Sequence, residues 1–440
     1  MTKKLRFCLC TTFYPPYNSD ADGLYVHRLA NGLAKLGHDV TVLHNPDAYE
    51  VLTGKKVADS YEDHPNITIK KITTPLKRLS LLAVHQTGRP FGQKASLQEC
   101  FKETFDVIHY YNISLLGGPD IFRHGQSTIK MCGLNDHWLI CPMHLLWKYT
   151  NEVCEKPQCI TCTVRNGKPP QFWRNTGLME SMTRHVDVFL GPSLFTIHKH
   201  RERGFKNIMI HLPPFYTIPE TGNVTERMLP VNGPYFLGVG RLEEYKGFQD
   251  VIPLFRHFQD HTLIICGRGS YSQQLHDLAD RMPNVLFVDQ LSQSQIQALY
   301  ENALATIVPS LCYQTFCHIT AESYSAGTPV IARKQSAVEE IIAEKGGGIL
   351  YTNSIELQQA ITTMITDVKK RNDLKDEAYQ AYHQEYSEDV YLQRYVHVVE
   401  ELLLQKTKFG AIRGYDPEQR TFAERKIFGL SSVPPDSYHQ

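Results

Sequence analysis

The chain has 440 residues, of which 42% are hydrophobic and 21% are charged, so it is long enough to form two globular domains. Its 46 lysines and arginines are balanced by 46 aspartates and glutamates, which excludes bulk electrostatic attraction to nucleic acid or to an anionic bilayer. No apolar run is long enough to span a membrane, and the 11 cysteines show no regular disulfide framework. These features predict a cytoplasmic protein.

The first half of the chain alternates short β-rich runs with amphipathic helices, a pattern typical of βαβ units around a parallel sheet. Its predicted strands are LRFCLCTTF, HDVTVLH, ITIKKITT, FDVIHYYN, STIKMCG and VDVFLGPS. A helix is predicted over residues 24–37. Its apolar face comprises Tyr25, Val26, Leu29, Leu33 and Leu36. Before this helix lies the loop YPPYNSDADGLY, in which Gly23 would allow the backbone to approach a ligand closely.

Residues 70–94 carry six basic residues, no acidic one and the apolar core LSLLAV. Two interpretations remain open for this segment. It could rest on an anionic membrane, or it could be a half-buried helix whose lysines are solvated.

Cysteines are concentrated after the fifth predicted strand. Cys159 and Cys162 form a close C-x-x-C pair, and Cys141 and Cys154 supply two further thiols. Four thiols of this kind suit a four-coordinate zinc ion, and they suit an iron–sulfur cluster less well. The candidate ligands are Cys141, Cys154, Cys159 and Cys162, with His137 and His144 as substitutes. The alternative is a set of unconnected reduced thiols. Four thiolates would leave no open position on the metal, so we expect it to staple an irregular loop and not to catalyse.

A polar, proline-rich stretch over 212–234 interrupts the pattern, and the second half then restarts it with YFLGVGR, HTLIICGRG, NVLFVDQ, ALATIVPS and TPVIAR. The predicted fold is α/β, with two doubly wound, Rossmann-like domains facing each other across a cleft. We divide the chain into a first domain over 1–213 with a cysteine-rich insertion at about 141–176, a linker over 214–233, a second domain over 234–385, a terminal helix over 386–405 that crosses back to the first domain, and a tail over 406–440.

The loop GVGRLEEYKGF follows the first strand of the second domain. The strand ends at Gly240, and Arg241 and Lys246 bracket the turn before the next helix. Two cations beside free helix N–H groups suit a diphosphate leaving group, because negative charge grows on it as the bond breaks. The alternative is a solvated turn with two ordinary basic residues.

A second loop over 311–317 precedes a helix that begins near His318. Its backbone N–H groups would point toward a phosphate. Glu322 lies four residues after His318 on the same helical face, where its carboxylate would accept hydrogen bonds from both hydroxyls of a ribose. The alternative is an exposed helical glutamate.

These segments together resemble the GT-B glycosyltransferases of family four, the glycosyl transferases group 1, in a form with a cysteine cluster in the N-terminal domain. The resemblance runs from FYPPYN…GLYVHRLANGLAKLGHDVTVL to GTPVIARKQSAVEEI. It is most specific in the second domain, where GRLEEYKG, PSLCYQTF, AES and GTPVIA occur in family order and spacing. The family consists of retaining enzymes that use nucleotide sugars without a metal in the active site.

The resemblance implies a role for each matching residue. Arg241 and Lys246 would bind the diphosphate, and Glu322, as the second glutamate of a Glu-x7-Glu motif, would hold the ribose. The donor phosphate and sugar would lie against Gly23, Gly240, Thr315, Phe316, Cys317 and His318. The first domain would bind the acceptor, with candidate contacts at His109, Asn112, Asn135 and Asp136.

The chain departs from the family pattern at four places. Gln314 replaces the first motif glutamate, Asp20 and Ala21 replace glycines before the first helix, Asn135 replaces a histidine, and Tyr111 replaces the second histidine of an HxHN strand end. Glutamine keeps an acceptor oxygen but removes a negative charge that would favour a developing oxocarbenium ion. The sequence Asp20-Ala21-Asp22 also matches an Asp-x-Asp metal motif of another glycosyltransferase class, and its place before a helix favours capping.

We therefore expect a retaining, metal-independent glycosyltransferase that moves a hexose-type sugar from a nucleoside diphosphate to a glycan, lipid-linked or small-molecule acceptor. Arg241, Lys246 and Gln314 would be its catalytic residues. Segment 70–94 would contact a membrane at the periphery if the acceptor is lipid-linked. The alternative function is that of a catalytically impaired relative that serves as a nucleotide-sugar sensor or partner subunit.

Overall fold

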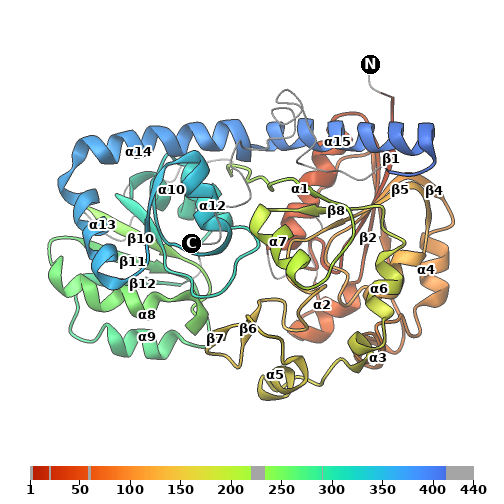
Figure 1. Ribbon diagram of the computed structural model, residues 1–440, viewed down its shortest axis with the longest axis horizontal. Helices are drawn as coiled ribbons and strands as arrows, with labels where there is room; N and C mark the ends of the chain where they lie inside the picture. Colours follow the sequence, from red (N-terminus) through yellow and green to blue (C-terminus); the bar gives the residue numbers. More distant parts are fainter. Residues whose placement is uncertain (1–2, 19–20, 58–60, 220–232, 290, 413–440) are drawn as a thin grey trace.

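The computed structural model of the chain describes residues 3–18, 21–57, 61–219, 233–289 and 291–412. These residues fold into two α/β halves that lie side by side (Figure 1). Most of the expected linker and most of the expected tail lie outside the described residues.

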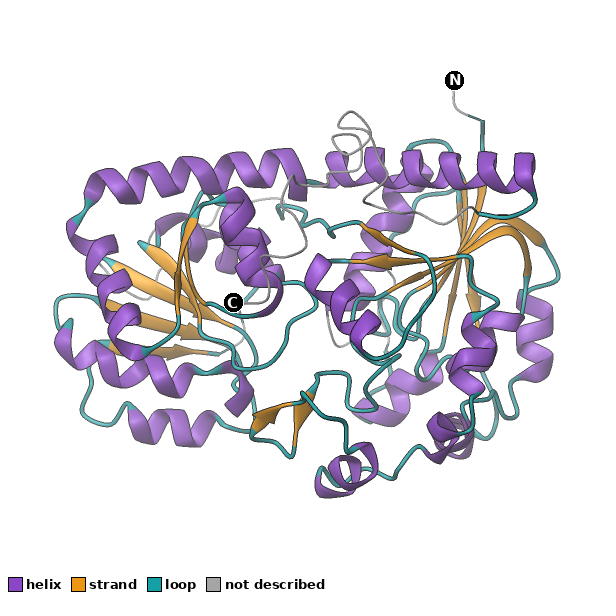
Figure 2. Cartoon of the chain, viewed as in Figure 1, coloured by secondary structure: helices purple, strands orange, loops and turns teal. Residues whose placement is uncertain are grey.

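The N-terminal half is built on a 7-stranded sheet in the order β3-β2-β1-β4-β5-β8-β9. Every neighbouring pair in this sheet is parallel. The strands are β1 (Arg6–Cys10), β2 (Asp39–His44), β3 (Ile67–Lys71), β4 (Thr104–Tyr110), β5 (Gln126–Gly133), β8 (Val188–Gly191) and β9 (Met209–His211). Helices flank the sheet (Figure 2): α1 (Ala21–Lys35), α2 (Pro46–Thr53), α3 (Lys77–Thr87), α4 (Lys94–Cys100), α6 (Leu178–Thr183) and α7 (Leu194–Glu202).

Helix α1 begins three residues before the predicted start, so Gly23 lies in its first turn and not in the preceding loop. Val26, Leu29 and Leu33 are buried as the periodicity predicts. The prediction for Leu36 is wrong: its side chain is 53% exposed, because the helix ends at Lys35.

The C-terminal half is built on a 6-stranded parallel sheet in the order β12-β11-β10-β13-β14-β15. Its strands are β10 (Tyr235–Val239), β11 (Thr262–Cys266), β12 (Val285–Val288), β13 (Ala305–Val308), β14 (Val330–Arg333) and β15 (Gly348–Tyr351). Its helices are α8 (Phe248–Val251), α9 (Ser272–Leu278), α10 (Gln293–Asn302), α11 (His318–Ser325), α12 (Ser336–Lys345), α13 (Ser354–Thr366) and α14 (Val368–Ala381).

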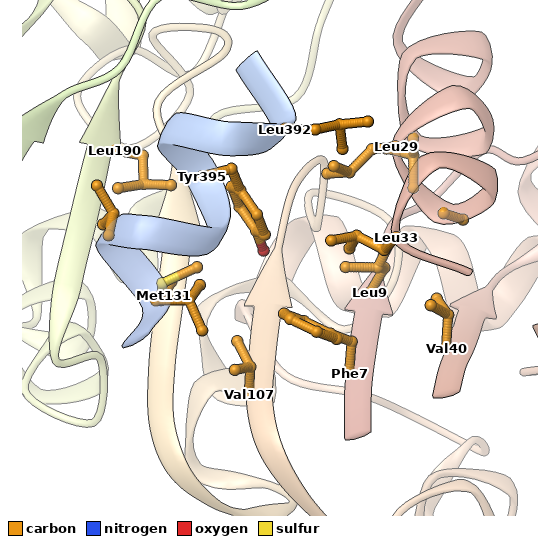
Figure 3. Packing of buried hydrophobic residues seen from close by; sticks show 14 of the residues in the cluster. Phe7, Leu9, Leu29, Leu33, Val40, Val107, Met131, Leu190, Leu392 and Tyr395 are labelled. Carbon is orange, nitrogen blue, oxygen red and sulfur yellow. The ribbon is translucent and has the colours of Figure 1, made fainter. Parts of the chain in front are cut away.

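The final helix, α15 (Glu388–Phe409), follows α14 and packs on the sheet of the N-terminal half (Figure 1). Its Tyr395 is fully buried in one cluster with Phe7 and Leu9 of β1 and Leu33 of α1 (Figure 3). This packing buries apolar surface from both ends of the sequence and thereby ties the two halves together. The helix extends to Phe409, so the first residues of the expected tail are helical.

The cysteine-rich insertion contains the two-stranded antiparallel hairpin of β6 (Trp147–Lys148) and β7 (Glu152–Val153), followed by α5 (Cys159–Arg165). Figure 1 shows the hairpin between the two halves. The sequence did not predict this hairpin, nor the edge strands β9 and β15. The strands of the hairpin have only two residues each, too few to show any periodicity.

The two-domain, parallel-sheet fold predicted from the sequence is confirmed. In each sheet, successive strands are first added on one side of the first strand and then on its other side. This switch falls between β1 and β4 in the first sheet and between β10 and β13 in the second. Ligands of doubly wound sheets bind at the carboxyl ends of such strand pairs. Among the described residues, no helix is long and apolar enough to cross a membrane.

Candidate active site

The loop after β10 meets the loop after β13. Gly247 has a φ of 77°, and a Cβ atom there would lie 2.1 Å from the carbonyl oxygen of Pro309, so only glycine allows the two loops to approach this closely. The backbone N–H of Leu311 donates to the carbonyl of Tyr245 at 2.8 Å. This contact places the cationic loop 241–246 beside the loop that leads into α11.

Arg241 and Lys246 lie within electrostatic reach of that second loop. Burial raises the pKa of the Cys312 thiol, and the charges of Lys246 and Arg241 oppose part of the shift. Burial and, to a smaller extent, the charge of Lys246 lower the pKa of His318 to about 4. No carboxylate among the described residues forms an ion pair with either cation. Two cations without an ion-pair partner among the described residues therefore lie near the loop that leads into α11.

The loop before α11 is fixed by specific hydrogen bonds. Gln314 donates its Nε2 to the hydroxyl of Ser310 at 2.7 Å, while its Oε1 is buried without a hydrogen-bond partner. Phe316 and Cys317 are buried, and α11 begins at His318 as the sequence predicts. The free amide oxygen of Gln314 is available to accept a hydrogen bond from a ligand.

Glu322 is not the exposed helical glutamate of the alternative interpretation. Its Oε2 accepts a hydrogen bond from the hydroxyl of Tyr300 at 2.8 Å. Burial raises the pKa of Glu322, and the Tyr300 hydrogen bond and the charge of Arg28 oppose that shift. Arg28 belongs to α1 of the other half and also contacts Gln293 at 3.1 Å. Sequence analysis did not identify Tyr300 and Arg28, because neither belongs to a local motif.

Gly23 and Gly240 have different environments. A Cβ atom at Gly23 would lie 2.7 Å from the Cβ of Asn18, so this glycine makes room for a neighbouring side chain. Gly240 has a φ of 147° and lies at the end of β10, where a Cβ atom would have space. Asp20 lies outside the described residues, and Ala21 is the first residue of α1.

His109 is a core residue. It is 1% exposed, and the hydroxyls of Tyr111 and Tyr395 both lie 2.9 Å from its Nδ1. Burial lowers its pKa to about 3, so the ring is neutral at physiological pH. Because α15 covers this ring, we leave His109 out of the proposed acceptor site, and Tyr111 in the place of the second histidine is a packing partner.

The other acceptor-side candidates lie at strand ends. The side-chain oxygen of Asn112 accepts hydrogen bonds from Thr12 at 3.3 Å and from Ser114 at 2.9 Å. Asn135 follows β5, and its carbonyl accepts a hydrogen bond from the hydroxyl of Thr315 at 2.6 Å. The asparagine that replaces a family histidine therefore contacts the donor-side loop through its backbone.

Asp136 forms an ion pair with His144 of the insertion. Its Oδ2 lies 2.7 Å from His144 Nδ1, and its Oδ1 accepts a hydrogen bond from the backbone of Trp138 at 2.8 Å. Burial raises the pKa of Asp136, but the charge and hydrogen bond of His144, the hydrogen bond from the backbone of Trp138 and the charge of His137 together lower it overall. Asp136 is thus an ionised residue that anchors the insertion.

Thr315 connects the donor-side loop to the N-terminal half. Its carbonyl accepts hydrogen bonds from the hydroxyls of Ser193 at 2.6 Å and of Thr196 at 3.0 Å, at the start of α7. These two residues were not identified from the sequence, although Ser193 ends a predicted strand and has the residue type of a helix cap.

The cysteines of the insertion are close enough to influence one another electrostatically. Burial raises the pKa of Cys141, Cys154 and Cys159, and neighbouring cysteines of the group contribute to each shift. Cys162 is buried on α5. Within the described part of the chain, however, no group of three or more His, Cys, Asp or Glu side chains is arranged to hold a metal ion. The ligand chemistry suits zinc, but the structure contains no preformed zinc geometry.

Part of the chain matches the model of a known protein family. Residues 225–381 match the family model of the glycosyl transferases group 1. The chain is 25% identical over 377 residues to the glycogen synthase of Mycobacterium tuberculosis (strain CDC 1551 / Oshkosh), a match that covers 78% of this chain and 82% of the relative.

Solved structures share the fold. The sucrose-phosphate synthase of Thermosynechococcus elongatus superposes with a TM-score of 0.68 at 14% identity, covering 91% of this chain and 100% of that one. Anabaena HepE in complex with UDP-glucose superposes with a TM-score of 0.62 at 15% identity, covering 90% of this chain and 100% of that one. The two halves therefore have GT-B architecture.

Proposed function

We propose that this glycosyltransferase, whose residues 225–381 carry a domain of the glycosyl transferases group 1, is a retaining enzyme that uses a nucleoside diphosphate sugar. It moves a hexose-type sugar to a glycan, lipid-linked or small-molecule acceptor. The observation that carries the proposal is the pair of cations, Arg241 and Lys246, which have no carboxylate partner among the described residues and lie near the loop that leads into α11.

The proposed chemistry centres on the leaving group. The bond between the anomeric carbon and the phosphate oxygen breaks, and the acceptor oxygen bonds to the same face of that carbon. The acceptor's proton passes to the leaving phosphate, so no separate protein base is required. Negative charge grows on the diphosphate, where Arg241 and Lys246 stabilise it without a metal ion.

Other residues would position the donor. The carboxylate of Glu322 holds the ribose hydroxyls, and Tyr300 orients that carboxylate through its hydroxyl. The unpaired Oε1 of Gln314 accepts a hydrogen bond from a sugar hydroxyl. Asn112, Asn135 and Asp136 are the proposed acceptor-side contacts.

The test is release of nucleoside diphosphate from a panel of UDP-, ADP- and GDP-sugars, with thermal shift on the same samples. We expect slow release with one donor, and stabilisation by the matching nucleotide. Gln314→Glu should change the rate within about tenfold, because glutamate keeps the shape and an acceptor oxygen. The absence of both release and stabilisation with every nucleotide would contradict the proposal.

We further propose that the four insertion cysteines hold one structural zinc ion. Their number and spacing support it, and Arg203 lies beside the group, with its guanidinium 3.8 Å from Cys154 Sγ. A cation there would offset the net negative charge of zinc bound by four thiolates.

Segment 70–94 supports a peripheral contact with an anionic membrane. Leu79 and Leu82 of α3 are each 52% exposed, and Phe91 is 47% exposed. Lys70 and Lys77 pair with carboxylates, so Arg78, Arg89 and Lys94 would supply the positive charge. Such a contact would present a lipid-linked acceptor to the N-terminal half.

A further inference from the structure

The β6–β7 hairpin connects the insertion to the proposed diphosphate site. It belongs to the N-terminal half of the sequence, yet the ring of its Trp147 lies 6.4 Å, centroid to centroid, from the ring of Tyr245. Tyr245 directly precedes Lys246 in the cationic loop of the C-terminal half. Figure 1 shows the hairpin reaching the space between the two halves. The insertion therefore contacts the donor side as well as the acceptor side.

The indole N–H of Trp147 is a buried donor without a partner. The side chain is 9% exposed, and its Nε1 has no hydrogen-bond partner among the described residues. Buried polar groups are nearly always hydrogen-bonded, and each exception calls for an explanation such as a ligand. Trp173, in the same insertion, shows the usual state: its Nε1 donates to the carbonyl of His85 at 2.9 Å.

The backbone around Trp147 is strained. His144, Leu146, Tyr149 and Thr150 all have positive φ values, between 49° and 70°, although none is a glycine. Only two other described non-glycine residues, Arg281 and Ser336, have a positive φ. Strained backbone of this kind concentrates at ligand-binding sites, where surrounding contacts hold a side chain in place. Here the strain surrounds the residue whose donor is unpaired.

The adjoining loop also carries an unpaired group. The buried Oε1 of Gln314 lacks a hydrogen-bond partner. Leu311 of the same loop donates its backbone N–H to the carbonyl of Tyr245. An acceptor without a donor and a donor without an acceptor thus occur on the two segments that adjoin Tyr245. A ligand with both hydroxyl groups and acceptor oxygens would satisfy both, as a nucleotide sugar does.

We propose that Trp147 donates its indole N–H to an oxygen of the bound nucleotide sugar, which makes the cysteine-rich insertion part of the donor site. This inference rests on the proposed function, since it takes the ligand from it. The oxygen belongs either to the diphosphate or to a sugar hydroxyl. Trp147 is a binding residue in this proposal, and the insertion that carries it positions it.

Tryptophan fluorescence provides a test that does not depend on turnover, because the chain has only 3 tryptophans. Wild type, Trp147→Phe and Trp173→Phe would be titrated with UDP, ADP and GDP and with their glucose conjugates. We expect a saturable fluorescence change in wild type and in Trp173→Phe, and loss of that change in Trp147→Phe. Phenylalanine keeps the ring but lacks the donor, so the Kd of the variant should rise by about tenfold.

Thermal unfolding without ligand separates a binding role from a structural one. Trp147→Phe should unfold near the wild-type temperature, since it removes an unsatisfied donor. If Trp147→Phe binds UDP itself more weakly than wild type does, the oxygen belongs to the diphosphate. If the affinity of the variant falls only for a nucleotide sugar, the oxygen belongs to the sugar. Unaltered affinity and fluorescence response in Trp147→Phe would overturn the inference while leaving the proposed function intact. If wild type binds no nucleotide by thermal shift, the proposed function fails first.

Discussion

Glu340 of α12 caps the start of α7 in the other half of the molecule. Its two carboxylate oxygens accept hydrogen bonds from the backbone N–H groups of Leu194 and Phe195, each at 2.9 Å. Glu340 is 7% exposed, and burial raises its pKa, while the two N–H groups oppose that shift. The same end of α7 binds the carbonyl of Thr315 through Ser193 and Thr196. One helix terminus therefore joins the two halves next to the donor-side loop.

Replacing Glu340 by alanine should loosen this junction. The change leaves two partly buried N–H groups without acceptors, at a cost of about 2 kcal/mol in the free energy of unfolding. We expect a lower melting temperature and a larger radius of gyration in small-angle scattering, with Glu340→Gln between alanine and wild type. Glu339→Ala is the matched control, because the Glu339 side chain is 32% exposed and lies 3.9 Å from Lys334. Equal effects of the alanine changes at 340 and 339 would contradict the capping role.

Arg241→Ala and Lys246→Ala should each reduce turnover by at least about a hundredfold, because they remove charge that stabilises the leaving diphosphate. Neither cation has a carboxylate partner among the described residues, so the melting temperature should stay near that of wild type. The measurement is initial rate of nucleoside diphosphate release. Arg281→Ala removes an arginine whose side chain is 92% exposed and serves as the control. Retained activity in both site variants would refute the diphosphate assignment.

Nucleotide affinity should weaken on acidification through the raised pKa of Glu322. Only the ionised carboxylate accepts hydrogen bonds from two ribose hydroxyls, so protonation costs affinity. The raised pKa also means that this group contributes folding stability at low pH, which is lost as the pH rises through that pKa. Calorimetric Kd values between about pH 5 and pH 8 would test this. Glu322→Gln should bind the nucleotide weakly, with a Kd that does not depend on pH over this range. If its Kd depends on pH as steeply as that of wild type, a group other than Glu322 titrates.

The zinc proposal predicts about one metal ion per chain in protein purified from zinc-supplemented cells. Cys159→Ser should lose the metal and melt at a lower temperature, because the ion staples the insertion. Cys266→Ser, at a buried cysteine of β11 in the other half, is the control and should retain the metal. Metal-free wild-type protein of unchanged stability would refute zinc binding.

Membrane contact through α3 predicts co-sedimentation with vesicles that contain phosphatidylserine and weaker co-sedimentation with phosphatidylcholine alone. Leu82→Glu should reduce binding severalfold, since it places a charge in the exposed apolar face. Leu404→Glu changes a leucine that is 66% exposed on α15, far along the sequence, and should bind as wild type does. Equal binding by both variants would rule out α3 as the contact.

The sequence by itself determined the two parallel sheets, the cationic loop at Arg241 and Lys246, and the start of α11 at His318. Each of these follows from local signals: alternating apolar periodicity, a glycine at a strand end, and basic residues at a fixed spacing. Local periodicity reports which face of an element is buried but not what covers it. For that reason the sequence places His109 among the acceptor-side candidates, and only the structure shows that Tyr395, 286 positions away, lies against its ring.

Only the tertiary structure decided the contacts between the halves. The contacts of Glu340 with the start of α7, of Thr315 with Asn135 and of Trp147 with Tyr245 all join residues that are distant in the sequence. Their partners depend on how the two sheets dock and on the return of α15 to the first sheet, and neither is encoded in a short motif. Glu340 and Thr315 find their partners in the tertiary structure because a polar group that is removed from water requires a hydrogen-bond partner from the segment that packs against it.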